Sequence, residues 1–129
     1  MENLIIKATD ITPEIYFNIA DRTFNISGES RPENVKDFFE PIHIWIDNYF
    51  NNLEGKENQI FTIKLAYFNS SSAKFLLSLL KNLGKFYQSG IKIEVNWCYE
   101  KDDDDMKEAG EQMSEMAKLP FKFIEKDEF

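Results

Sequence analysis

The sequence predicts a two-layer α/β domain in which a mixed β-sheet carries its helices on one face. Stretches with the two-residue alternation of strands are interleaved with stretches of helical periodicity, in the order hairpin, helix, strand, helix, strand, helix, strand. The strands that follow helices alternate apolar and polar residues, whereas strands covered on both faces are continuously apolar. We therefore expect helices on one face and solvent on the other, in a single domain spanning residues 1–129.

The first part of the chain is predicted to form a hairpin and then a long helix. Residues 14–28 contain two alternating runs, and a short strand is expected before them at residues 4–6. Residues 32–53 repeat apolar side chains at helical spacing. We expect Ser30 to cap this helix and Pro41 to kink it.

The rest of the chain alternates strands with helices. Strands are predicted at residues 59–67, 91–99 and 120–124, and helices at residues 72–87 and 103–117. We expect strands joined by a helix to be connected through right-handed crossovers.

Composition excludes several classes of function. Fifteen Lys and Arg residues stand against 23 Asp and Glu, which gives a net charge of −8. Nucleic-acid binding normally needs a basic stripe, and none is visible. No apolar run reaches the roughly 20 residues of a membrane helix. We therefore expect a cytoplasmic protein without a nucleic-acid partner or membrane insertion, and one Cys with one His predicts neither a metal site nor a cofactor.

No set of residues typical of catalysis is visible. His43 falls within a predicted helix without an orienting partner, and Cys98 lies in a strand without an activating base. The acidic run Asp102–Asp105 fails the calcium-loop pattern, because Met106 stands at a ligand position and Lys107 where glycine is required. The run suits the first turn of a helix, with an electrostatic partner surface as a second interpretation. We expect no enzyme activity.

The most informative segment is the strand-to-helix turn after the central strand. Asn69 is followed there by Ser70, Ser71 and Ser72. One interpretation is ordinary helix capping, which needs only one such residue. The other is a phosphorylation switch, because a phosphate would place about −1.5 to −2 charge at the positive end of a helix dipole. Lys74 is close enough to screen that charge.

The helix after this turn is more apolar than a surface helix needs to be. Phe75, Leu79 and Phe86 form a second stripe beside its main apolar face. Either the neighbouring helices cover this stripe, or it is an exposed surface for a partner.

These features resemble the STAS domains of anti-sigma factor antagonists and, more specifically, the SiaC family of bacterial regulatory phosphoproteins. The resemblance covers nearly the whole chain. The residues that carry it are Thr12-Pro13, the run from Ile26 to Ser30, Pro32-Glu33-Asn34, the segment from Tyr67 to Lys74, Trp97-Cys98-Tyr99 and Pro120-Phe121.

The resemblance implies a STAS-like fold and a non-catalytic protein that switches partners. In that family the hydroxyl directly after the Asn is phosphorylated by a serine/threonine protein kinase, and a metal-dependent serine/threonine phosphatase removes the phosphate. By position this residue is Ser70, with Asn69, Ser71, Ser72 and Lys74 around it, and Ser stands where Thr is usual.

The resemblance also implies an effector. The unmodified form is expected to bind and activate a diguanylate cyclase, or another effector, and so to tune cyclic-di-GMP output and biofilm behaviour. The alternative is a constitutive interaction or scaffold domain whose serines only cap a helix.

Overall fold

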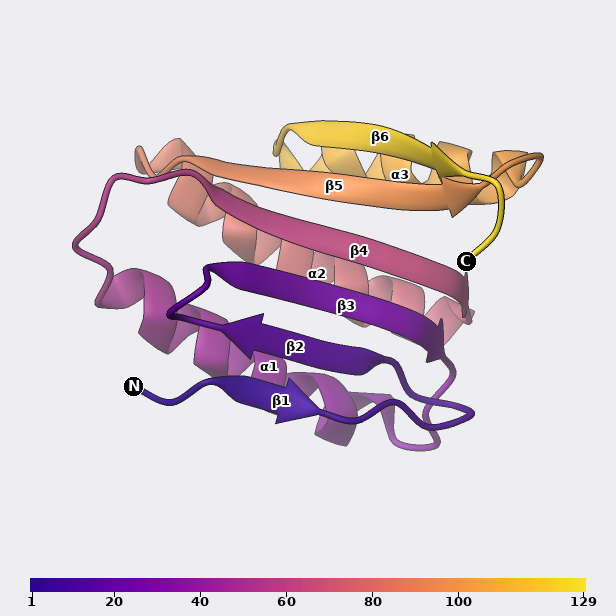
Figure 1. Cartoon of the computed structure of the whole chain (residues 1–129), viewed down its shortest axis with the longest axis horizontal. Coiled ribbons are helices and arrows are strands. Elements are labelled where there is room, and N and C mark those ends of the chain that lie inside the picture. Colours follow the sequence, from indigo (N-terminus) through magenta and orange to yellow (C-terminus); the bar gives the residue numbers. More distant parts are fainter.

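Six strands form one mixed sheet in which the spatial order follows the chain order (Figure 1). The computed structural model describes residues 1–129. The strands are β1 (Leu4–Ile6), β2 (Glu14–Asn18), β3 (Thr23–Ser30), β4 (Gln59–Phe68), β5 (Ile93–Glu100) and β6 (Phe121–Lys126), and the helices are α1 (Val35–Asn51), α2 (Ser70–Gln88) and α3 (Asp104–Ala117).

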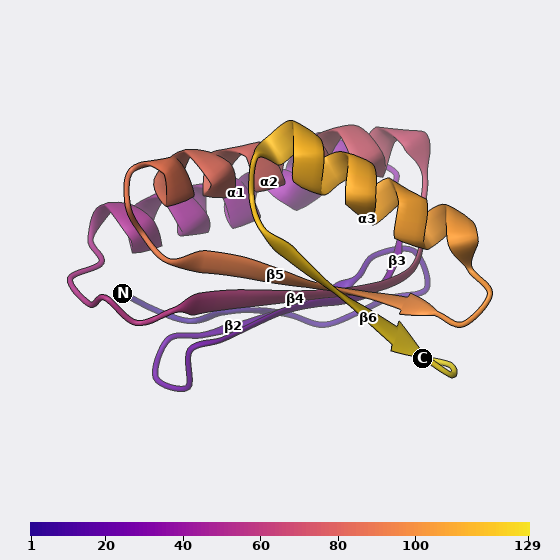
Figure 2. The same cartoon turned by 90° about the horizontal axis from the view of Figure 1, so that it is seen from above.

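The sheet has an antiparallel part and a parallel part. β1 to β3 pair antiparallel, and β3 to β6 pair parallel. One helix joins each parallel pair, and Figure 2 shows all three helices over the same face of the sheet. The predicted fold class is therefore confirmed. Because each crossover steps to the next strand in the same direction with its helix on the same side, all three crossovers have the same hand.

The first helix begins later than the sequence pattern predicted. Its cap is Asn34, whose side-chain oxygen accepts a hydrogen bond from the Asp37 amide at 3.1 Å. The prediction of Ser30 as the cap is wrong, because Ser30 is the buried last residue of β3. The chain uses the residues between Ser30 and Asn34 to leave the sheet before α1 starts. α1 then continues through Pro41, which lies on its exposed side.

The core between the sheet and the helices is rich in aromatic rings. Phe17, Phe24 and Phe61 come from three adjacent strands, and the rings of Phe24 and Phe61 stack with centroids 4.7 Å apart. Trp45 and Tyr49 of α1 lie against this cluster, with their own rings stacked 5.1 Å apart. Each aromatic pair adds about 0.5–1.5 kcal/mol beyond the burial of apolar area. These contacts hold α1 against the antiparallel part of the sheet and the adjoining β4.

The second apolar stripe of α2 faces α1. Leu79 is fully buried. Phe75 stacks on Phe39 with centroids 6.0 Å apart, and Phe86 stacks on Phe50 at 5.1 Å. Leu79 is thus buried and Phe75 and Phe86 are half-buried, so of the two interpretations the structure favours packing of this stripe between helices. α2 is the central helix and packs on a neighbour at each side as well as on the sheet.

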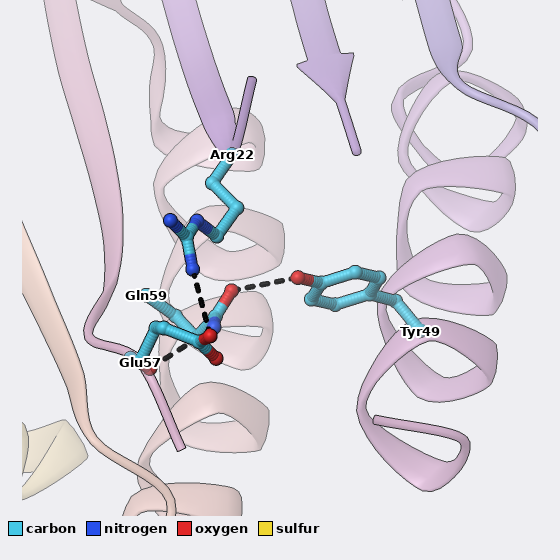
Figure 3. A network of polar contacts seen from close by, with 4 residues as sticks. All are labelled: Arg22, Tyr49, Glu57 and Gln59. Atoms are coloured by element: carbon cyan, nitrogen blue, oxygen red, sulfur yellow. Dashed lines mark hydrogen bonds and ion pairs between the residues drawn. The ribbon is translucent and has the colours of Figure 1, made fainter. Parts of the chain in front are cut away.

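A polar network closes the end of the sheet at which β4 begins (Figure 3). The Tyr49 hydroxyl donates to Gln59 Oε1 at 2.7 Å, and the Gln59 side-chain nitrogen donates to the Glu57 carbonyl at 3.0 Å. Glu57 in turn pairs with Arg22 at 3.3 Å. Gln59 is fully buried, so these bonds satisfy an amide that would otherwise lose its hydration without compensation. Burial also raises the pKa of Tyr49, which keeps its hydroxyl protonated as the donor.

α3 approaches the sheet closely because it carries a glycine where it crosses β5. A Cβ atom built on Gly110 would lie 2.5 Å from the Trp97 ring. Trp97 is buried, and its indole N–H donates to the Met106 carbonyl at 2.9 Å. The ring therefore cannot move aside without losing this hydrogen bond.

We predict that Gly110→Ala destabilises the protein by about 1–3 kcal/mol through overpacking against Trp97, even though alanine favours helix by about 1 kcal/mol. Urea unfolding measures this difference. The neighbouring Glu111 is exposed, and Glu111→Ala should change stability by no more than about 0.5 kcal/mol. A Gly110→Ala protein as stable as the wild type would show that the close approach does not matter.

Candidate functional site

The serine-bearing turn connects β4 to α2 at the carboxyl ends of the parallel strands. Asn69 caps the helix: its side-chain oxygen accepts from the Ser72 amide at 2.9 Å, and its carbonyl accepts from the Ala73 amide at 2.9 Å. α2 therefore begins at Ser70, two residues earlier than predicted. The amides of Ser70 and Ser71, at the first two positions of the helix, have no acceptor within it.

The three serines have different environments. Ser72 is fully buried, and its hydroxyl donates to the Ser30 carbonyl at 2.9 Å and accepts from the Ser30 hydroxyl at 2.8 Å. The Ser30 carbonyl also accepts from the Asn69 amide at 3.0 Å. Ser70 and Ser71 are exposed. Asn69 thus supplies the cap and Ser72 anchors the turn to β3, which leaves two accessible hydroxyls.

An irregularity in β4 changes which aromatic side chain faces the core. Gly28 of β3 pairs with Leu65, but the next residue of β3 pairs with Tyr67, so Ala66 is an extra residue in β4. Continued alternation after Phe61, Ile63 and Leu65 would place Tyr67 on the same buried face. The bulge instead leaves Tyr67 48% exposed and turns Phe68 inward, where it meets Trp97 edge-on with centroids 6.3 Å apart.

A groove runs beside this turn, along α3. It consists of two adjoining hollows of about 280 Å³ and 350 Å³ that share Phe68 and Ala109. The first lies between α2 and α3, and the second lies between the end of β4 and the start of α3. We call these two hollows the α3 groove. Its walls are Ala66, Tyr67, Phe68, Ala73, Lys74, Leu77, Asp103, Asp105, Met106, Ala109, Gln112, Met113 and Met116.

Charged side chains lie at both parts of the α3 groove. Lys74 is exposed, lines the first hollow and follows Ser70 by one helical turn. Asp103 and Asp105 line the second hollow. The only ion pair in the structure joins Arg22 and Glu57 at the other end of the sheet, so Lys74 has no carboxylate partner within the chain.

The acidic run is placed as the helix interpretation predicted. Asp103 caps α3 by accepting from the Met106 amide at 3.1 Å, and Asp104 and Asp105 lie in the first turn. Their carboxylates therefore complement the helix dipole. No three His, Cys, Asp or Glu side chains lie together in a way that could hold a metal ion.

The other two titratable candidates, His43 and Cys98, lie on opposite faces of the sheet and do not form a site together. His43 lies in α1, in a polar hollow with Asp47 and Lys81, on the helical side of the sheet. Cys98 follows Trp97 in β5 and points to the opposite face, where it is nonetheless buried. Burial raises the pKa of the Cys98 thiol, and two neighbouring lysines oppose this effect only in part. A thiol held protonated is a weak nucleophile.

The fold and the site together define a small α/β domain with an accessible serine at a helix start, a buried anchor beneath it and an apolar groove beside it. None of the three helices has the length and hydropathy of a membrane span. The family described as SiaC family regulatory phosphoprotein matches residues 6–126. The chain therefore belongs to the SiaC family.

Individual relatives agree with this assignment. An uncharacterized protein of Pseudomonas aeruginosa strain UCBPP-PA14 is 27% identical over 99% of this chain and 100% of its own length. The crystal structure of apo-SiaC from Pseudomonas aeruginosa is 27% identical and superposes with a TM-score of 0.85 over 96% of this chain and 99% of that chain.

A second solved structure shows such a protein with its partner. SiaC of Pseudomonas aeruginosa, in a complex in which it is the activator of the diguanylate cyclase SiaD, is 25% identical to this chain. It superposes with a TM-score of 0.87 over 95% of this chain and 99% of that chain. The expectations of a STAS-like fold and of a regulatory protein, rather than an enzyme, are confirmed by the family and by these structures.

We predict that Ser72→Ala destabilises the protein by about 1–3 kcal/mol, because it leaves the buried Ser30 hydroxyl without its acceptor. Ser70→Ala should change stability by less than about 0.5 kcal/mol, because Ser70 is exposed and does not supply the cap. Urea unfolding of both variants checks the assignment. Equal losses would show that the two hydroxyls do not differ as described.

A pH dependence follows from the raised pKa of Cys98. The folded state holds the thiol proton more tightly than the unfolded state, so this contribution to stability is complete below the ordinary thiol pKa of 9.0 and is lost as the pH rises through the folded value. We expect the free energy of unfolding to fall as the pH rises through and above 9.0, and to fall less in Cys98→Ala. An identical fall in both proteins would contradict the shift.

Proposed function

We propose that this protein is a partner-switching regulator whose unphosphorylated form binds and activates a diguanylate cyclase, and whose phosphorylation at Ser70 prevents that binding. The observation that carries the proposal is the exposed Ser70 hydroxyl at the first position of α2, one helical turn before Lys74 of the α3 groove. The Pseudomonas aeruginosa SiaC–SiaD complex, formed by a protein of the same fold and family, supports the choice of effector.

Helix geometry favours Ser70 over Ser71. Residues four apart lie on the same face of a helix. Ser70 therefore shares a face with Lys74, which lines the α3 groove. Ser71 shares a face with Phe75, which stacks on α1. A phosphate on Ser70 would lie next to the groove, whereas one on Ser71 would lie towards α1.

The modification itself requires two partner enzymes. A serine/threonine kinase would transfer the γ-phosphoryl group of ATP to Ser70 Oγ, with the hydroxyl proton passing to the kinase and ADP leaving. A metal-dependent serine/threonine phosphatase would add water across the phosphoester and return the serine and inorganic phosphate. Because both ATP and the GTP used by a cyclase are cytoplasmic, the proposal places the protein in the cytoplasm.

The phosphate would act through charge and desolvation. It adds about −1.5 to −2 charge to a chain whose net charge is −8. At an interface, this dianion would have to lose water and face the partner without a prepared counter-charge. A penalty of about 2.7 kcal/mol would weaken binding about a hundredfold.

The scaffold alternative needs the serines for capping, and the turn does not use them in that way. Asn69 alone provides the capping oxygen, and Ser72 is committed to Ser30. Nothing in the local fold requires a hydroxyl at Ser70. A residue that the fold does not need is free to serve as a phosphorylation site.

The site of modification can be read from one peptide. Cleavage after Lys64 and Lys74 releases a fragment that contains all three serines, and mass spectrometry of protein from its native host should find the phosphate on Ser70. Phosphate on Ser71 would move the site by one residue. A well-covered fragment without phosphate under all growth conditions would favour the scaffold alternative.

The effect on the partner is measured by calorimetry and by cyclic-di-GMP formation. Each diguanylate cyclase of the host should be titrated with wild type, Ser70→Ala and the Ser70-phosphorylated protein. We expect one cyclase to bind and respond to the first two equally, and to bind the phosphorylated form about a hundredfold more weakly. Equal affinity for the modified and unmodified proteins would refute the switch.

A further inference from the structure

We propose that the hollow between α1 and α2 is a docking site for an acidic segment of a partner protein, and that Lys81 and Lys85 of α2 hold this segment. We call it the α1–α2 hollow. It shares no lining residue with the α3 groove. The inference does not depend on phosphorylation of Ser70, and it adds a second binding surface to the domain.

The first support is the distribution of charge among the three helices. α2 contains three lysines and no acidic residue, whereas α1 contains one lysine with three acidic residues and α3 contains one lysine with five. The central helix of a chain with a net charge of −8 is therefore positive, and both of its neighbours are negative. Ser78, Lys81 and Lys85 follow one another at spacings of three and four residues, so they lie on one exposed face of α2.

The second support is the chemistry of the hollow. It has a volume of about 340 Å³ and no apolar side chain in its walls. Its lining residues are Ser78, Lys81, Asn82 and Lys85 of α2 and His43 and Asp47 of α1. An apolar partner surface would bury nothing there, whereas carboxylates would meet two ammonium groups, a hydroxyl and an imidazole.

The third support is that the two lysines have no carboxylate partner. The only ion pair of the structure joins Arg22 and Glu57. Asp47, the one carboxylate in the hollow, accepts a hydrogen bond from Asn82 Nδ2 at 2.7 Å, which joins α1 to α2. A partner segment can therefore supply the carboxylates that the chain does not. Because the two lysines are one helical turn apart, glutamates spaced one turn apart on a partner helix match them.

The neighbouring helices limit where such a segment can bind. An acidic segment is attracted along α2 and repelled by the exposed carboxylates of α1 and α3 on either side. Charges are screened beyond about 8 Å at physiological ionic strength, so lysines in direct contact outweigh the net charge of the whole chain. Attraction in the middle and repulsion at the sides fix the position of the segment.

The experiment is titration of the ¹⁵N-labelled full chain with a capped polyglutamate peptide in about 0.1 M salt, followed by NMR of the backbone amides. We expect saturable binding with the largest shifts between Ser78 and Lys85 and at His43. The double variant Lys81→Glu/Lys85→Glu should bind about tenfold more weakly. Asp47→Asn removes the negative charge from the hollow, keeps an acceptor for Asn82 and should bind about twofold more tightly.

The matched control is Lys122→Glu, which reverses an exposed lysine on the opposite face of the sheet and should bind as the wild type does. An equal loss in this control would show that only net charge matters. Absent binding, or shifts centred elsewhere, would also overturn the inference. If pyrophosphate binds the hollow and the peptide does not, the ligand is a small phosphate compound instead. None of these outcomes touches the proposed function, which is tested separately with the cyclase.

Discussion

The buried pair of Ser30 and Ser72 is the contact on which the geometry of the site depends. It joins the last residue of β3 to the first turn of α2, across 42 positions of sequence, by two hydrogen bonds of 2.8 and 2.9 Å. Both hydroxyls are fully buried, so each bond also avoids the penalty of a dehydrated polar group. The Ser30 carbonyl further accepts from the Asn69 amide, so that the cap, the helix start and the strand end form one unit. Ser70 is exposed because its neighbours are fixed in this way.

Contacts around Trp97 hold α3 and the end of β4 in place beside that unit. Trp97 lies under the start of α3 and is held by the Met106 carbonyl, while Gly110 lets the helix approach the ring. Phe68 meets the same indole from β4. Buried residues of the core, among them Met106 and Met113, therefore form part of the walls of the α3 groove. A preformed surface loses less entropy on binding than a mobile one.

Local sequence predicted the elements well and their contacts less well. Alternation was sufficient to predict the strands β2, β3 and β5, and helical periodicity was sufficient to predict α2 and α3, because each element buries one regular face. Ser30 was wrongly expected to cap α1, since nothing in the neighbouring residues shows that its partner is Ser72. Tyr67 continues the alternation of Phe61, Ile63 and Leu65, and no local signal shows the bulge at Ala66 that exposes it. The second stripe of α2 was ambiguous, since the periodicity of one helix does not identify which neighbours cover it.

The candidate site was likewise predicted only in part, because contacts between elements far apart in the sequence determine its geometry. Hydroxyls at a helix start are visible in sequence, but the burial of Ser72 depends on its two long-range hydrogen bonds to Ser30. The α3 groove could not be predicted, because its walls come from β4, α2 and α3. The family resemblance supplied what local patterns could not, namely the regulatory role and the choice of Ser70 among three adjacent serines.

The sequential strand order has a further consequence for the kind of molecule this fold can recognise. Open α/β sheets usually bind small ligands in a crevice at the point where the strand order reverses and helices pass to the opposite face. In this sheet the order runs from β1 to β6 without reversal, and every helix stays on the same side. The topology therefore builds no crevice between diverging crossovers. What it offers at the carboxyl ends of the parallel strands is a surface of helix starts and exposed side chains beside the α3 groove, a shape that another protein can cover.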